Sequence, residues 1–289
     1  MLAMMALAQM TVILTRGIDL SVAANLALTG MLVALVSRAV PGLPIPAIML
    51  LALGLGLCLG LFNGGLIAYM GIPPIVVTLG TLAIYRGLIF IIAKGQWITS
   101  QGMSEAFLAF PKAHWVGISS LVWVAGVVIV GMVVFLNHTR TGRGLYAVGG
   151  NPTAARYCGI DLRRSQMIVY ALSGMIAGLC GYLWVSRYGI AYSDIAQGYE
   201  LTVIASCVIG GVSIAGGIGT VSGTVLGALF LGLLANALPV INISPFWQMA
   251  ISGVVILTAV IFNARAEKPV GKLILPASRR GWRAEVPHE

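Results

Sequence analysis

Long runs of apolar residues, separated by short polar segments, extend along most of the chain. A helix needs about 20 apolar residues to cross the hydrocarbon core of a bilayer. The runs that meet this length are residues 19–38, 46–69, 73–93, 116–136, 166–186 and 246–263. The tract 200–236 is rich in small residues and predicts two further spans, with a break near Gly216 and Gly217. Residues 1–15 are apolar as well but would make a short span, about 22 Å at 1.5 Å per residue.

The predicted fold class is therefore all-α, a polytopic transmembrane helical bundle with about nine spans. Composition agrees, since 59% of the 289 residues are hydrophobic and 9% are charged. Soluble globular domains carry about a quarter charged residues, and disordered chains combine low hydrophobicity with high net charge. The composition excludes both classes, and the apolar runs lack the alternation of barrel strands.

Basic residues outnumber acidic residues by 17 to 8, and the excess is concentrated in two segments. Residues 137–164 contain five arginines and one aspartate, and residues 264–289 contain six basic and three acidic residues. Loops rich in Lys and Arg stay on the cytoplasmic side of a membrane, so both segments are predicted to be cytoplasmic. Few aromatic residues accompany these charges, which argues against a nucleic-acid partner.

The order of the spans then assigns a side to the remaining loops. Counting back from a cytoplasmic tail places residues 94–115, 187–199 and 237–245 outside, and residue 1 at the outer face. An external start without a cleavable signal is awkward to insert. We therefore expect an upstream helix, crossing from inside to outside, to be missing.

Glycines recur at four-residue spacing in three runs: Gly56, Gly60 and Gly64; Gly174 and Gly178; and Gly219, Gly223 and Gly227. Each run lies on one helix face and favours close helix packing. The cluster Gly210, Gly211, Gly216 and Gly217 is different, because so many glycines within eight residues weaken a helix. Broken backbone at membrane depth is tolerated against protein or a water-filled path, so this segment either packs against helices or lines a pathway.

The sequence carries no recognisable catalytic or metal-binding motif. It has no P-loop, no Gly-x-Ser-x-Gly elbow and no HExxH pattern. His114, His138 and His288 are far apart, and the four cysteines lack CxxC spacing. We therefore predict no metal, no cofactor and no enzymatic activity in this chain.

Three charged residues fall inside apolar runs or at their ends, where ionisable groups often have a function. Asp19 follows Arg16 by three residues, which predicts a local ion pair at a span junction. Arg86 either snorkels outward or pairs with a buried acid. Glu200 opens the glycine-rich tract and could cap a helix N-terminus. A proton relay would need more carboxylates or histidines along one path, which disfavours a proton-coupled transporter.

The segment GRGLYAVGGNPTAARYCGIDLRRSQ predicts a short cytoplasmic helix between two spans. The residues concerned are Gly150, Asn151, Pro152, Ala154, Ala155, Arg156 and Gly159. The Asn-Pro pair favours a turn, and proline suits the first position of a helix. A glycine seven residues later is typical of a helix C-terminus. Such a helix is either a simple surface feature or a docking element for a partner.

Four stretches, in this order, resemble the ribose/xylose/arabinose-type permeases of bacterial ABC importers: TRGIDLSVAANLALTG, TLGTLAIYRG, GGNPTAARYCGID and ELTVIASCVIGGVSIAGGIGTVSGTVLGALFLGLLANAL. The resemblance covers nearly all of residues 1–265. The stretch VIGGVSIAGGIGT, followed by NALPVINISPFWQMAISG, looks most like rhamnose permeases, with autoinducer-2 permeases as the second choice. Family members typically have ten spans, which agrees with one helix missing before TRGIDLS.

The resemblance implies a permease domain over residues 1–264 with a coupling loop at 137–165, and a basic cytoplasmic tail at 265–289. It implies import of a small neutral sugar, rhamnose or a related monosaccharide, across the bacterial inner membrane. The implied partners are ABC ATPase subunits that hydrolyse ATP, a second permease copy or paralogue, a periplasmic sugar-binding protein and membrane lipid. In the family an AA-x3-G pattern, here Ala154, Ala155 and Gly159, seats in a cleft of the ATPase.

Polar positions inside apolar runs suggest a translocation path near Asn63, Thr78, Thr81 and Asn236, and hydrogen-bonded packing explains them equally well. Two other functions are the alternatives. A secondary transporter would show inverted repeats, and the two halves show no convincing repeat. An intramembrane enzyme acting on lipid would need a nucleophile–base or metal constellation, and the sequence contains none that can be recognised.

Overall fold

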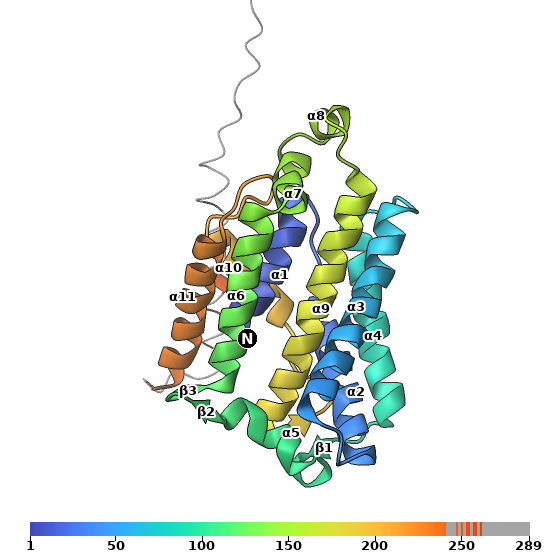
Figure 1. Cartoon of the computed structure of the whole chain (residues 1–289), viewed down its shortest axis with the longest axis vertical. Coiled ribbons are helices and arrows are strands. Elements are labelled where there is room, and N and C mark those ends of the chain that lie inside the picture. The colour runs from blue at the N-terminus through green and yellow to red at the C-terminus, as the bar shows by residue number, and fades with distance from the viewer. Residues whose placement is uncertain (241–246, 248–249, 251–252, 255–256, 259–260, 262–289) are drawn as a thin grey trace, which may run out of the picture.

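The computed structural model describes residues 1–240 and, beyond them, positions 247, 250, 253–254, 257–258 and 261. Apart from these positions, the predicted span 246–263, the segment 241–245 of the predicted outer loop and the tail 265–289 lie outside the described residues. Helices dominate and run side by side along the long axis of the molecule (Figure 1). The main helices are α1 (Leu2–Leu14), α2 (Val22–Ala39), α3 (Ile45–Ala68), α4 (Pro74–Ala93), α6 (Ser120–His138), α7 (Arg140–Gly150), α8 (Pro152–Tyr157), α9 (Leu162–Tyr188), α10 (Tyr199–Ile209) and α11 (Val221–Val240).

The helical membrane bundle predicted from the sequence is confirmed. Within the described chain, five helices are long and apolar enough to cross a membrane: α2, α3, α4, α6 and α9. The helix α1 has 13 residues and α10 has 11, so at 1.5 Å per residue they reach only about 20 Å and 16 Å. The tract 200–236, predicted as two spans, therefore forms one short and one long helix.

The outward faces of the bundle are apolar. Large apolar side chains are exposed on α4, α6 and α11: Leu79, Ile84, Phe90, Ile91, Val127, Val130, Leu229 and Leu233 among them. Soluble monomers seldom expose apolar surface of this extent. These faces suit contact with lipid or with another membrane subunit.

The short elements gather at one end of the bundle, opposite α8 (Figure 1). They are β1 (Ile98–Thr99), α5 (Glu105–Ala109), β2 (His114–Trp115), β3 (Ile118–Ser119), β4 (Ile190–Ala191) and the 3₁₀ turns Ser100–Gly102 and Phe110–Lys112. The strands β1 and β4 pair antiparallel, with Ile98 opposite Ala191. This pairing joins 94–115 to 187–199, the two segments predicted to be external, at the end away from the predicted cytoplasmic loop.

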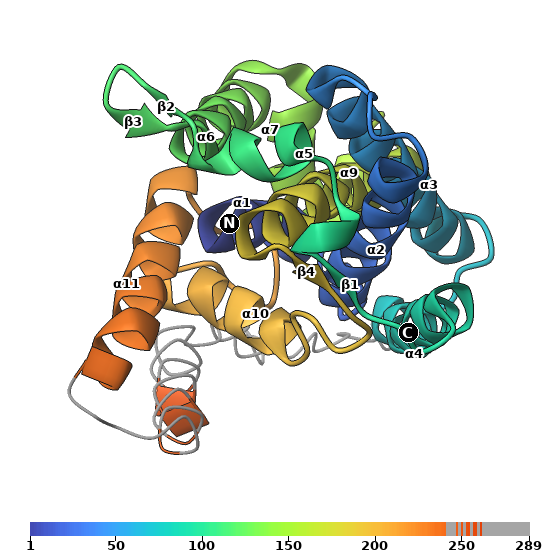
Figure 2. The ribbon, with the colours of Figure 1, turned by 90° about the horizontal axis from the view of Figure 1, so that it is seen from below.

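The helix α1 lies in the middle of the bundle (Figure 2). Its residues from Met4 to Leu14 are all buried. A helix that is apolar all round is expected to be enclosed by other helices, and this explains the position of α1. The polar Gln9 and Thr11 are enclosed with it.

Glycines bring α3 and α9 into backbone contact. A Cβ atom on Gly56 would collide with the backbone of Gly174 and Gly178, and one on Gly60 with the backbone of Tyr170 and Gly174. The packing role predicted for these glycines is therefore confirmed. Small residues drive helix association in membranes because they let backbones approach closely.

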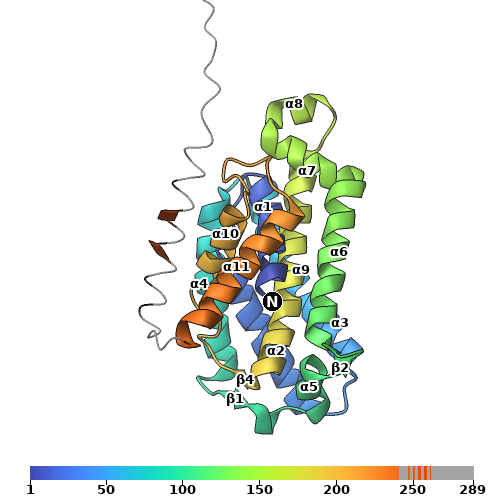
Figure 3. The ribbon, with the colours of Figure 1, turned by 90° about the vertical axis from the view of Figure 1, so that its left-hand side faces the viewer.

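The tract 200–236 breaks at residues 210–220, as predicted from its glycines. Gly211, Gly216 and Gly217 have φ angles of +82°, +88° and +76°, which glycine adopts without the steric cost borne by other residues. The connection lies beside α7 and the end of α1 (Figure 3), and the Gly217 N–H donates to the Leu14 carbonyl oxygen at 3.0 Å. Of the two alternatives, this segment packs against protein.

Candidate functional site

The chain between α1 and α2, residues 15–21, is not helical and is largely buried. Backbone groups at membrane depth must find partners inside the protein. In the amide orientation that satisfies its neighbours, Gln9 donates to the Asp19 carbonyl oxygen and accepts from the Asp19 N–H, both at 3.1 Å. Thr78 Oγ1 on α4 donates to the Ile18 carbonyl oxygen at 3.1 Å. Two different helices thus hold this irregular segment.

The carboxylate of Asp19 is enclosed, with 3% of the residue exposed. It accepts hydrogen bonds from the Ser21 N–H at 3.0 Å, the Ser21 hydroxyl at 2.7 Å and the Ser173 hydroxyl at 3.0 Å. The predicted ion pair with Arg16 is wrong, because Arg16 donates instead to carbonyl oxygens at the end of α7. Arg16 has a φ of +64°, so the chain leaves α1 there and the three-residue spacing no longer places the two side chains on one helix face.

Further polar side chains extend this site across the bundle. Asn63 Nδ2 on α3 donates to Ser21 Oγ at 2.8 Å. The hydroxyl of Tyr85 on α4 donates to the Leu59 carbonyl oxygen at 2.9 Å and to Asn63 Oδ1 at 3.4 Å. We call the connected residues the buried polar layer: Gln9, Asp19, Ser21, Asn63, Thr78, Tyr85 and Ser173.

The four predicted pathway positions do not share one environment. Asn63, Thr78 and Thr81 are buried, and Thr81 Oγ1 donates within its own helix, to the Thr78 carbonyl oxygen at 3.4 Å. Asn236 is exposed on α11 and donates to the Gly232 carbonyl oxygen at 2.7 Å. Hydrogen-bonded packing describes the buried positions as they lie here, and their role in a pathway stays a prediction.

Sequence analysis missed four members of the buried polar layer: Gln9, Ser21, Tyr85 and Ser173. A signal was present, since each interrupts or borders an apolar run. Buried polar groups need partners, so isolated polar residues on separate spans are candidates for meeting one another. Which of them meet depends on how the helices pack, and spacing along the chain does not contain that information.

Arg86 lies in α4, and its side chain donates hydrogen bonds to backbone carbonyl groups. Its Nη1 donates to the carbonyl oxygens of Ser193 at 2.8 Å and Ile195 at 2.7 Å. The acidic groups whose charges act on it are Glu200 and Asp194. The guanidinium therefore holds the turn that precedes α10, within the segment 187–199 that is predicted to be external, and the choice between the two predicted alternatives for Arg86 stays a prediction.

Glu200 lies in the first turn of α10, where a negative charge is favoured by the helix dipole. The capping residue itself is Gly198, with φ of +77°. Glu200 is therefore near the N-terminus as predicted but does not cap it. Its Oε2 is buried and has no hydrogen-bond partner among the described residues.

The predicted cytoplasmic helix is α8. Asn151 Oδ1 accepts from the Ala154 N–H at 3.0 Å, which caps the helix, and Pro152 occupies its first position. Gly159 has φ of +79° and ends the turn that leads to α9. Asp161 then caps α9 by accepting from two backbone N–H groups. The local motif read from the sequence therefore folds as expected.

The two predicted docking alanines face different ways. Ala154 is exposed, whereas Ala155 is 3% exposed and packs inward. Consecutive helical residues point about 100° apart, which explains the difference, and contact of both alanines with a partner stays a prediction. Tyr157, which sequence analysis did not single out, is 87% exposed at the end of α8.

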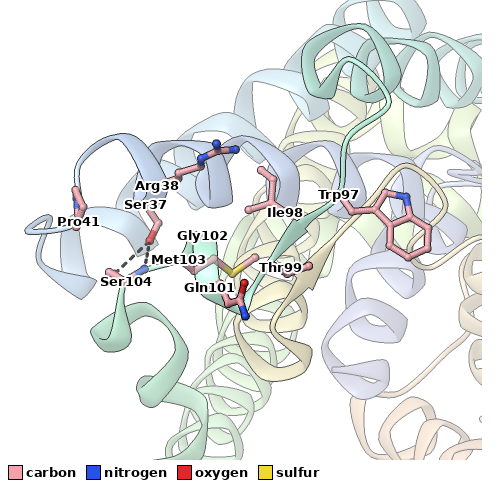
Figure 4. A pocket seen from close by; sticks show the side chains of 10 residues that line it. All are labelled: Ser37, Arg38, Pro41, Trp97, Ile98, Thr99, Gln101, Gly102, Met103 and Ser104. Carbon is pink, nitrogen blue, oxygen red and sulfur yellow. Dashed lines mark hydrogen bonds between the residues drawn. The ribbon is translucent and has the colours of Figure 1, made fainter.

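A hollow of about 490 Å³ opens at the opposite end of the bundle. Figure 4 shows Arg38, Trp97 and Gln101 among its lining residues. The Ser104 N–H donates to Ser37 Oγ at 3.2 Å, and this hydrogen bond joins two of the segments that line the hollow. The residues come from the end of α2 and from the segment around β1.

The family described as "Branched-chain amino acid transport system / permease component" matches residues 1–260. The chain belongs to this permease family. The permease is 36% identical over 273 residues to the "Autoinducer 2 import system permease protein LsrC" of Photorhabdus laumondii, covering 94% of this chain and 81% of the relative. It is 37% identical over 269 residues to the "Ribose import permease protein RbsC" of Escherichia coli K12, covering 92% and 83%. No solved structure gives a significant match.

Membership confirms the resemblance to permeases of ABC importers. Such a permease is a transport subunit and not an enzyme. Permeases of this type work with ATPase and binding-protein partners. The functional groups of such a subunit guide a substrate or transmit movement.

Proposed function

We propose that this permease imports a small neutral sugar across the bacterial inner membrane, driven by ATP that a separate ATPase subunit hydrolyses. The observation that carries the proposal is similarity of 36–37% over more than 90% of the chain to permeases of ribose and autoinducer-2 import systems. The 1–264 region would act as the permease domain, with 265–289 as a cytoplasmic tail.

The specific sugar we propose is rhamnose or a related monosaccharide, on the strength of the glycine-rich motif and the segment after it. Autoinducer 2 is the second candidate, because LsrC permeases are among the similar proteins. Selection of the imported sugar is expected to reside in the periplasmic binding protein. Thermal-shift measurement of that protein with rhamnose, ribose and autoinducer 2 separates the candidates, and stabilisation by ribose or autoinducer 2 alone would reject rhamnose.

The docking surface that we propose for the ATPase is the exposed face of α8, formed by Thr153, Ala154, Arg156 and Tyr157. Ala154 is small enough to let a cleft close over the helix, and an exposed tyrosine supplies the kind of aromatic anchor that dominates many interfaces. Ala155 supports this surface by packing inward, and the exposed Gly159 ends the helix with a left-handed turn.

A second permease copy or paralogue would complete the pathway. The buried polar layer is enclosed by helices of this chain, so we place the sugar path against the partner permease, with Asn236 exposed on α11 as a candidate lining residue. The opposite end, with its hollow beside Trp97, would face the sugar-binding protein.

The energy source tests the proposal most directly. Proteoliposomes that contain the permease, its ATPase and the binding protein should accumulate sugar in proportion to ATP on the ATPase side. A proton uncoupler should leave this uptake unchanged. Uptake that collapses with the uncoupler and ignores ATP would refute the proposal in favour of a secondary transporter.

A further inference from the structure

Three segments that are distant in sequence meet where α1 ends. They are the end of α1 with Arg16, the end of α7 at Gly149 and Gly150, and the α10–α11 connection at Gly216 and Gly217. A Cβ atom on Gly149 would collide with the backbone of the other two segments, and one on Gly217 with the backbone of the α7 end. The three backbones are therefore in direct contact. Figure 3 shows α7, the end of α1 and the α10–α11 connection at the same end of the bundle.

Arg16 joins two of these segments through its side chain. Its Nε donates to the Gly149 carbonyl oxygen at 2.6 Å, and its Nη2 donates to the Gly150 carbonyl oxygen at 2.9 Å. The last carbonyls of a helix have no partner within the helix and carry its negative dipole end. A planar guanidinium offers two donors in a fixed fork, which suits two successive carbonyl groups.

The Arg16 contact connects α8 with the buried polar layer. On one side, Gly150 is followed at once by Asn151, which caps α8. On the other side, Asp19 lies three residues after Arg16 and is fixed in the buried polar layer by three hydrogen bonds. The sequence separation across the Arg16 contacts is 133 and 134 residues.

We propose that Arg16 is a positioning residue that transmits movement of α8 to the buried segment 15–21, and so couples ATP hydrolysis to transport. The inference rests on the proposed function, because it presupposes an ATPase that moves α8. Movement of α8 displaces the carbonyl groups of Gly149 and Gly150, and the guanidinium carries that displacement to the backbone beside Asp19. The left-handed backbone at Arg16 aims the side chain toward α7 and away from the carboxylate.

A simpler role has to be distinguished from this one. Arg16 is exposed on its remaining side, and it lies at the end of the bundle where positive charge fixes orientation in the membrane. A purely topological charge would be replaced without loss by lysine. Lysine is a point charge on a flexible stem and cannot hold two carbonyl groups in the geometry of the fork.

The test compares Arg16→Ala, Arg16→Lys and the wild type in proteoliposomes with the ATPase and binding protein, using radiolabelled rhamnose or ribose. The quantity measured is sugar moved per ATP hydrolysed. We expect this ratio to fall at least tenfold in Arg16→Ala and several-fold in Arg16→Lys, while the ATPase still co-purifies and still hydrolyses ATP. Arg143→Ala is the matched control and should keep the wild-type ratio. The Arg143 side chain is exposed on α7 and, within the described part of the chain, its guanidinium donates to the Asn137 carbonyl oxygen, six residues away, at 3.3 Å.

Each other result overturns the inference. A wild-type ratio in Arg16→Lys would reduce Arg16 to a topological charge, and this variant decides the case if Arg16→Ala does not insert. Parallel loss of transport and ATPase binding would show that Arg16 serves assembly. If the wild type itself shows no ATP-dependent uptake, the proposed function fails and the inference falls with it; normal wild-type uptake with an unchanged ratio in the variants refutes the inference alone.

Discussion

Replacing Asp19 tests whether the buried polar layer stabilises the broken backbone between α1 and α2. Asp19→Ala removes the acceptor of three hydrogen bonds, which come from the Ser21 N–H, the Ser21 hydroxyl and the Ser173 hydroxyl. An unsatisfied buried donor costs about 1–3 kcal/mol, whereas hydrogen bonds between membrane helices average about 0.6 kcal/mol. The hydroxyl groups can rotate to other acceptors and the N–H cannot, so we expect a loss of about 2–4 kcal/mol.

Asp19→Asn separates hydrogen bonding from charge. The asparagine oxygen can still accept both bonds from Ser21, and its NH₂ group can donate to the Ser173 hydroxyl, which is both donor and acceptor. We therefore expect a loss below about 1 kcal/mol. If charge itself were required, the asparagine and alanine variants would be equally impaired.

The assay heats the purified permease in detergent and measures, by size-exclusion chromatography, the fraction that remains folded at each temperature, which gives the Tm. Domains of 150–250 residues lose about 2–4 °C in Tm per kcal/mol, which predicts a fall of about 4–16 °C for Asp19→Ala and below about 4 °C for Asp19→Asn. Asp161→Ala is the control, because this exposed aspartate also accepts two backbone N–H bonds, as the cap of α9. Equal shifts in Asp19→Ala and Asp161→Ala would refute the reasoning that burial magnifies the loss.

Three further changes probe other parts of the molecule. Gly56→Ala should lower stability by about 1–3 kcal/mol, measured in the same unfolding assay, because its Cβ overlaps the α9 backbone; an unchanged Tm would contradict the backbone contact. Ala154→Trp should abolish co-purification of the ATPase while the permease stays folded. Ala155→Trp should instead lower the Tm of the permease itself, since Ala155 is buried. Normal ATPase binding in Ala154→Trp would show that α8 is not the docking surface. The exposed Cys158 should react with an impermeant thiol reagent only after permeabilisation, because its loop is predicted to be cytoplasmic. Val116→Cys, made in a Cys158→Ser background, should react from outside without permeabilisation. The reverse pattern of labelling would show that the predicted sides of the membrane are exchanged.

What the sequence predicted well depends on local chemistry. The helix α8 follows from an Asn-Pro cap and a terminal glycine within one short segment, and each element appears where the pattern placed it. The break at 210–220 follows from glycine density in the same way. The central position of α1 is not among these predictions: residues 1–15 are predicted only as a short span, and the structure shows Met4–Leu14 enclosed by other helices.

What the sequence did not predict depends on contacts between distant segments. Arg16 and Asp19 are three residues apart and carry opposite charges, yet Arg16 finds its acceptors 133 and 134 residues away. Arg86 likewise binds carbonyl groups 107 and 109 residues away instead of a carboxylate. In both cases the acceptor is a backbone carbonyl, which every residue carries, so no sequence pattern marks it.

The distribution of contacts also indicates where this permease can rearrange. The backbones of α3 and α9 touch through mutual glycine contacts, and close-packed surfaces of this kind switch between discrete arrangements and do not deform gradually. The junction at the end of α1 is held by individual hydrogen bonds, including Gly217 N–H to Leu14, and each such bond contributes only about 0.5–1.5 kcal/mol. The helix α8 joins this junction directly, since Asn151, which caps α8, follows Gly150 in the chain. We therefore expect conformational change to be absorbed by the segments 15–21, 149–151 and 210–220, while α3 and α9 move together as one unit.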